Sequence, residues 1–75
     1  MKEKMTRETM LAYVQALIEG YKADIRQAIK EGVISNGDYT WQEYLVDYTG
    51  IELDREEDAA LLTDAQLQQI VAAYI

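Results

Sequence analysis

Signals that start α-helices recur along this 75-residue chain, and they constrain its fold more than any other feature. In a capping box, a threonine side chain accepts a hydrogen bond from the backbone three residues on, and a Glu or Gln there returns the contact. The pairs Thr40–Glu43 and Thr63–Gln66 have this spacing. Thr6 and Asp54 are two further residues of types that cap helices. Helix starts at four places predict an all-α fold.

Apolar residues flank each threonine cap with the spacing of a hydrophobic staple, which fixes the direction in which the chain enters the helix. The three staple pairs are Met5–Met10, Tyr39–Tyr44 and Leu62–Leu67. Gly32 and Gly50 stand where a residue in the left-handed conformation would end a helix. These signals together predict helices over about residues 7–31, 41–49, 55–61 and 64–75.

We therefore expect a single all-helical domain over residues 1–75, a small bundle of three or four helices with a long first helix packed against shorter ones. At about 1.5 Å per residue, a 25-residue helix is roughly 37 Å long. A compact domain of this size is only about 30 Å wide. The first helix is therefore expected either to bend at Gly20 or to project beyond the others.

The chain contains no cysteine and no histidine, which argues against most classes of catalysis. Without thiol or imidazole groups it lacks the commonest nucleophile, general base and zinc ligands. An EF-hand alignment of Gly37 and Glu43 would put Gly32 and Ile34 at the first two ligand positions, where carboxylates are needed. We expect no enzymatic activity, no metal and no cofactor.

The charged residues are distributed unevenly. Residues 1–31 contain six Lys or Arg and five Asp or Glu, whereas residues 32–75 contain nine Asp or Glu and one Arg. The net charge of −7 therefore arises entirely in the second part of the chain. Acidic residues favour helix N-termini and solubility. A surface of spaced carboxylates also attracts basic proteins in a salt-dependent way.

The leading hypothesis is a non-catalytic acidic protein-binding module. It would engage a basic, nucleic-acid-binding protein by mimicking nucleic acid, as an inhibitor or accessory factor of the mobile-element type. Direct binding of nucleic acid is disfavoured, because a polyanion repels such a surface. Aromatic residues beside the carboxylates would supply anchors. The candidate partner-binding residues are Asp38, Glu43, Asp47, Glu52, Asp54, Glu56, Glu57, Asp58, Trp41 and Tyr44.

Two other functions stay open. The first is a small homo-oligomeric structural or regulatory domain, such as a homodimer, that uses the apolar stripe of the first helix. The second rests on Gly50–Asp54, Leu62–Thr63 and Gln66, which resemble the last third of acyl carrier proteins. That resemblance implies phosphopantetheine on a serine within Asp-Ser-Leu. The second alternative is thus an acyl-carrier-like protein modified at Ser35, the only serine, which lies within Ile34-Ser35-Asn36.

The apolar run Met10–Ile18 is interrupted by Gln15 and is too short to span a bilayer. The absence of cysteine fits a reducing compartment. A cytoplasmic protein without a membrane partner is therefore expected.

Overall fold

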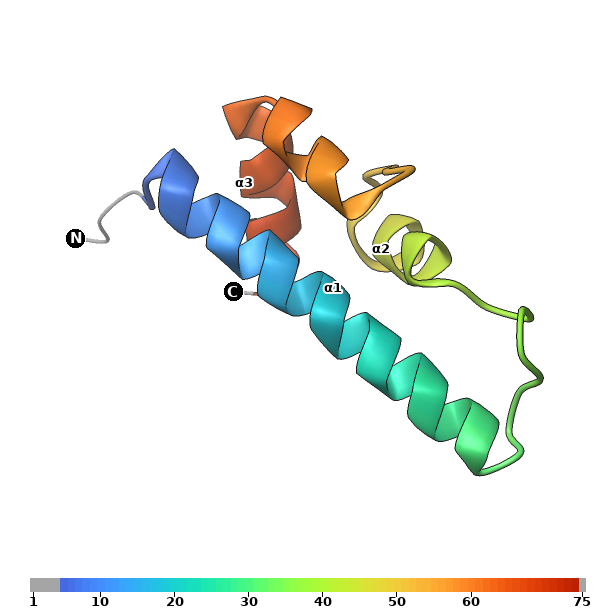
Figure 1. Cartoon of the computed structure of the whole chain (residues 1–75). Helices are drawn as coiled ribbons and strands as arrows, with labels where there is room; N and C mark the ends of the chain where they lie inside the picture. The colour runs from blue at the N-terminus through green and yellow to red at the C-terminus, as the bar shows by residue number, and fades with distance from the viewer. Residues whose placement is uncertain (1–4, 75) are drawn as a thin grey trace.

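The computed structural model describes residues 5–74, and they confirm the all-α prediction (Figure 1). A long first helix packs against three shorter ones, and no strand occurs between residues 5 and 74. The elements are α1 (Arg7–Lys30), α2 (Trp41–Thr49), the 3₁₀ helix η1 (Glu56–Leu61) and α3 (Asp64–Ala72). Ile75, the end of the fourth predicted helix, lies outside the described residues, and α3 itself ends at Ala72.

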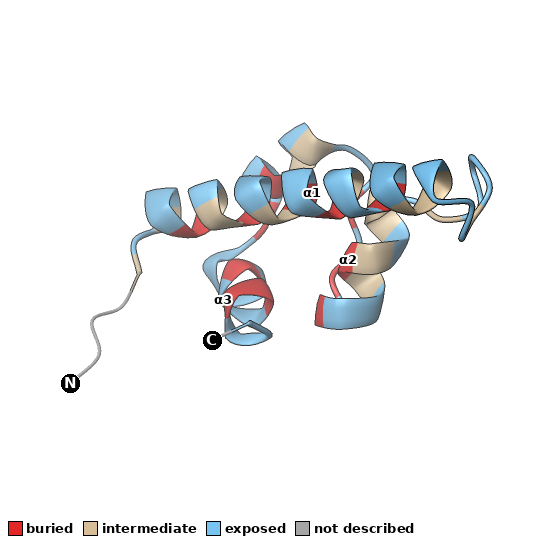
Figure 2. Cartoon of the chain, turned by 90° about the horizontal axis from the view of Figure 1, so that it is seen from below, coloured by how far each residue is buried: buried red, intermediate tan, exposed pale blue. Residues whose placement is uncertain are grey.

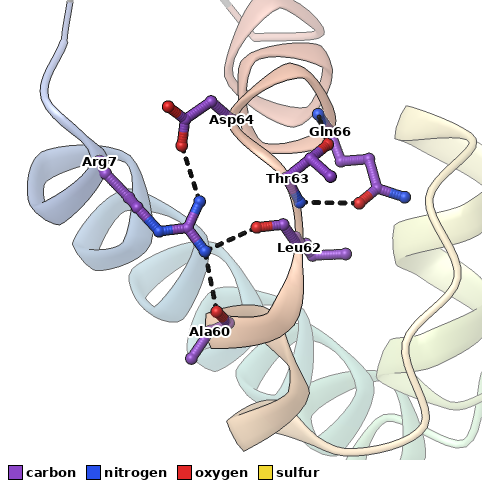
Figure 3. Close-up of polar contacts among 6 residues, drawn as sticks. All are labelled: Arg7, Ala60, Leu62, Thr63, Asp64 and Gln66. Atoms are coloured by element: carbon purple, nitrogen blue, oxygen red, sulfur yellow. Dashed lines mark hydrogen bonds and ion pairs between the residues drawn. The ribbon is translucent and has the colours of Figure 1, made fainter.

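The predicted cap of α1 and the predicted capping box of α3 are both confirmed. Thr6 Oγ1 accepts a hydrogen bond from the Thr9 N–H at 3.1 Å. At α3 the contact is reciprocal: the Gln66 N–H donates to Thr63 Oγ1 at 3.1 Å, and the Thr63 N–H donates to Gln66 Oε1 at 2.9 Å (Figure 3). Local sequence thus determines where both helices begin.

Only half of the predicted capping box of α2 is present. The Glu43 N–H donates to Thr40 Oγ1 at 3.3 Å. The Glu43 carboxylate, however, lies 3.5 Å from the Thr40 hydroxyl instead of accepting from the Thr40 backbone. Thr40 therefore caps α2 by itself, and the Glu43 carboxylate is exposed.

Asp54 does not cap the third helix. η1 begins one residue later, and the Arg55 N–H donates to Asp58 Oδ2 at 3.2 Å. The reason is burial: Ala59 and Leu62 are buried and Glu56 is half-buried, a spacing of three residues. Within η1 that spacing places Glu56 and Ala59 on one face of the 3₁₀ helix, and Leu62 follows it as the buried, extended C-cap residue.

The predicted glycine stops are confirmed. Gly32 and Gly50 have φ of +77° and +78°. After α1, the Gly32 N–H donates to Ile29 O at 3.1 Å and the Val33 N–H donates to Ala28 O at 2.9 Å, which together form a Schellman motif.

α1 runs unbroken through Gly20, so the helix does not end or divide there. The molecule measures 44 × 25 × 17 Å along its principal axes. The last turns of α1 extend beyond α2 and α3 and are followed by the loop that returns to α2 (Figure 1). The projecting end is thus the C-terminal one, and Ile25 is the last buried residue of α1.

A single hydrophobic cluster joins all four helices. α2 and α3 pack on the same side of α1, where its buried residues face them (Figure 2). A hydrogen bond from Gln69 Nε2 to Thr49 O at 2.7 Å also links α3 to the end of α2. The cluster contains Met10, Val14, Ile18, Tyr21, Leu45, Ile51, Leu53, Ala59, Leu62, Leu67, Ile70 and Val71.

Gly20 is the one glycine that the fold does not require. It lies inside α1 with ordinary helical geometry, and a Cβ added there would have no atom within 4 Å. A glycine within a helix costs about 1 kcal/mol relative to alanine. Neither the stability of α1 nor the packing of the core therefore explains why position 20 is a glycine.

Candidate functional site

The predicted acidic residues fall into two groups in the structure. Around the segment between α2 and η1, three shallow hollows share Asp54 in their walls. Asp38 and Asp47 line none of these hollows. We define the acidic patch by the six carboxylates that do: Glu43, Glu52, Asp54, Glu56, Glu57 and Asp58.

Several carboxylates of the acidic patch have partners within the fold. Glu56 Oε2 lies 2.5 Å from Lys22 Nζ, and Asp58 caps η1. Glu57 Oε1 lies 3.4 Å from the Arg55 guanidinium, with both side chains largely exposed. Among the residues described, Glu52 and Asp54 have no ion-pair or hydrogen-bond partner for their carboxylates. These two exposed carboxylates, together with Glu57, are the ones most available to an external cation.

Asp38 and Asp47 have roles in the segment before and along α2. Asp38 Oδ2 accepts a hydrogen bond from the Ser35 N–H at 2.9 Å, which closes a turn. Asp47 accepts a hydrogen bond from the Tyr39 hydroxyl. The carboxylates of Asp38 and Asp47 therefore both have partners close by in the sequence.

Ser35 is exposed in this loop, well before Thr40, and so does not open α2.

The ion pair between Glu56 and Lys22 connects η1 to α1 and perturbs both groups. The hydrogen bond from the Lys22 ammonium lowers the pKa of the Glu56 carboxyl below its ordinary value of 4.5. The same hydrogen bond raises the pKa of Lys22 above its ordinary value of 10.5. In both cases the charged form is favoured in the folded protein.

This pair should make stability depend on pH at the acid end. Because the folded pKa of Glu56 is depressed, its contribution is present above pH 4.5 and decreases as pH falls through the lowered pKa. Glu56→Gln should therefore reduce the urea midpoint at pH 7 and make it fall less steeply below pH 4.5. Urea titrations at several pH values measure this. An unchanged acid slope would contradict the assignment.

An exposed leucine adjoins the acidic patch. Leu61, at the end of η1, is 81% exposed and lines the same hollow as Glu52, Asp54 and Asp58. Its neighbour Leu62 is buried, because only one of the two can face the core. Two consecutive leucines in the sequence indicate that one of them is exposed, but Leu61 was not among the predicted partner-binding residues. A partner could bury Leu61 while its cations contact the surrounding carboxylates.

The aromatic residues of α2 divide between this patch and a second site. Trp41 is half-buried and lines a hollow with Asp54 and Glu57. Tyr44 lies elsewhere, in a cleft of about 490 Å³ between α2, α1 and the C-terminal end of the chain. We call this the tyrosine cleft, and its four rings are Tyr21, Tyr44, Tyr48 and Tyr74.

Three rings of the tyrosine cleft are nearly parallel. Tyr21 and Tyr44 have centroids 5.4 Å apart and planes 20° apart. Tyr48 lies 6.0 Å from Tyr44 and 6.2 Å from Tyr21, with planes 14° and 16° apart. The Tyr21 hydroxyl shares a hydrogen bond with that of Tyr74, and burial raises the pKa of Tyr21 above its usual range. Tyr48 remains 61% exposed at the edge of this stack.

α1 completes the cleft with residues that the sequence prediction missed. Leu17, Gly20 and Asp24 line it, and none of the described lining residues is a Lys or Arg. Asp24 is exposed and has no ion-pair partner within residues 5–74. The i, i+4 spacing of Gly20 and Asp24 was visible in the sequence, but their proximity to Tyr48 and Tyr74 requires the tertiary fold.

No family model, curated protein or solved structure matches this chain. No helix within residues 5–74 has both the length and the apolarity needed to cross a membrane. In the same part of the chain, no three His, Cys, Asp or Glu side chains are grouped so that they could hold a metal ion. The function must therefore be inferred from the shape and charge of the chain itself.

Proposed function

We propose that the protein is a non-catalytic binding module whose acidic patch docks on a basic protein surface. The observation that carries this proposal is the cluster of exposed carboxylates around Asp54, beside the exposed Leu61. Glu52 and Asp54 have no partner in the described chain that would account for them. Exposed apolar and charged side chains lie side by side in protein interfaces.

Spaced carboxylates can occupy a site that otherwise binds phosphates. A nucleic-acid-binding protein presents such a site, with Lys and Arg placed to contact a polyanion. The net charge of −7 on 75 residues would steer the two proteins together and would make association sensitive to salt. The proposed partner is thus a basic protein, and the acidic patch and nucleic acid would compete for the same site on it.

A pull-down with the immobilised protein, carried out at low and at high salt, tests whether the acidic patch binds a basic protein. Captured proteins should be nucleic-acid-binding, should elute as salt rises, and should be displaced by added duplex DNA. The double variant Glu52→Lys, Asp54→Lys should weaken capture about tenfold or more at low salt, because each attraction becomes a repulsion. These residues are preferred to Glu56 and Asp58, whose reversal would also disturb the fold.

The matched control reverses two carboxylates outside the acidic patch, Glu8→Lys and Glu31→Lys, with the same change in net charge. A Leu61→Ala variant separately tests the exposed leucine beside the patch and should weaken capture without altering salt sensitivity. Capture that persists equally in the patch variant and the control, and that does not respond to DNA, would refute the proposal. Concentration-dependent sedimentation of the free protein would instead favour the homo-oligomer.

A further inference from the structure

Gly20 and the tyrosine cleft belong to one feature. The backbone of Gly20 does not need a glycine, and an added Cβ would point into open space. Gly20 also lines the cleft, between Leu17 and Asp24 on α1. A residue that weakens its helix without improving packing is best explained by the space that it leaves empty, which is part of the cleft that Gly20 lines together with Tyr21 and Tyr48.

We propose that the tyrosine cleft binds an arginine side chain of a protein partner. Tyr48 is largely exposed and offers a ring for stacking, and its plane is nearly parallel to those of its neighbours Tyr21 and Tyr44. A planar guanidinium stacks on such a face while donating hydrogen bonds in its own plane. Asp24 supplies the carboxylate for those donors, and Gly20 keeps the approach open.

Charge complementarity selects a cation as the occupant. Among the described residues that line the cleft, Asp24 is the only charged one. The nearby Lys22 does not neutralise it, because its ammonium contacts Glu19 and Glu56. Arginine suits the cleft better than lysine, because a compact ammonium cannot lie flat on Tyr48 and also present several donors to Asp24.

This inference extends the proposed function, since the same basic partner could supply the arginine, but it concerns a different surface and can be tested without that partner. The probe is an acetylated and amidated Gly-Arg-Gly peptide, titrated into isotope-labelled protein and followed by NMR. Resonances of Gly20, Asp24 and Tyr48 should shift, with binding on the order of millimolar. Peptides with lysine or with neutral citrulline in place of arginine should bind several-fold more weakly.

Gly20→Leu is the decisive variant. It should fill the cleft and abolish the shifts, while raising the Tm because leucine is a better helix former than glycine. Ala12→Leu, at an exposed α1 position outside the cleft, is the matched control and should leave the titration unchanged. Tyr48→Ala should weaken binding about two- to fivefold, as expected for one exposed cation–π contact.

Two results would overturn the inference: arginine-specific shifts confined to the acidic patch, or identical titrations for Gly20→Leu and Ala12→Leu. Shifts confined to the acidic patch would leave the proposed function intact. Conversely, binding at the cleft with no effect of Glu52→Lys, Asp54→Lys on capture would refute the proposed function alone.

Discussion

Replacing Leu45 with alanine is expected to destabilise the protein by about 2–5 kcal/mol, the largest effect of any single substitution considered. Leu45 is completely buried and is the α2 member of the hydrophobic cluster, against which Trp41 and Tyr44 also pack. A chain of this length should have a free energy of unfolding of only about 4–11 kcal/mol. The cavity left by Leu45→Ala would therefore remove a large part of the total stability.

Urea denaturation measures this loss, with helical circular dichroism and the fluorescence of the single tryptophan, Trp41, as probes. Leu61→Ala is the matched control, because the same atoms are removed from a side chain that is 81% exposed. Its effect on stability should stay within about 0.5 kcal/mol. Equal losses for the two variants would contradict the placement of Leu45 in the core.

Most of the fold could be predicted from the sequence because its helix ends are determined locally. Thr6, Thr63 and Gly32 act through contacts with residues a few positions away, so their spacing alone predicts the structure. The error at Asp54 has a different origin. The start of η1 depends on the burial of Ala59, which the sequence around Asp54 does not reveal, and its cap is the contact between the Arg55 N–H and Asp58.

The candidate site was less predictable, since charge in a sequence does not show which carboxylates are already in use. Glu56 looked equivalent to Glu52, yet it forms an ion pair with Lys22, which lies far away in the sequence. The tyrosine cleft was missed for a related reason. Its rings come from α1, from α2 and from the segment after α3, and a hydroxyl contact joins Tyr21 to Tyr74. The sequence feature that pointed to this cleft was Gly20, a glycine within a helix that the backbone does not require.

Arg7→Met is expected to destabilise the protein by about 1.5–3 kcal/mol, the range for hydrogen bonds made by a charged group. Arg7 joins the start of α1 to the connection between η1 and α3 (Figure 3). Its Nη2 donates to Ala60 O at 2.8 Å and to Leu62 O at 2.6 Å, and its Nη1 contacts Asp64 Oδ1 at 2.7 Å. The two carbonyls lie at the C-terminal end of η1, where the helix supplies no N–H of its own.

The comparison with Asp64→Asn separates the two kinds of contact. The carboxylate of Asp64 is largely exposed, so its ion pair with Arg7 should contribute no more than about 1 kcal/mol and should weaken in salt. The bonds to Ala60 O and Leu62 O are to neutral acceptors, and most of the Arg7→Met loss should therefore persist at high salt. Urea midpoints of both variants at low and high ionic strength measure this difference. If Arg7→Met and Asp64→Asn lost the same stability and both losses vanished at high salt, Arg7 would act as a surface charge and not as the C-terminal cap of η1.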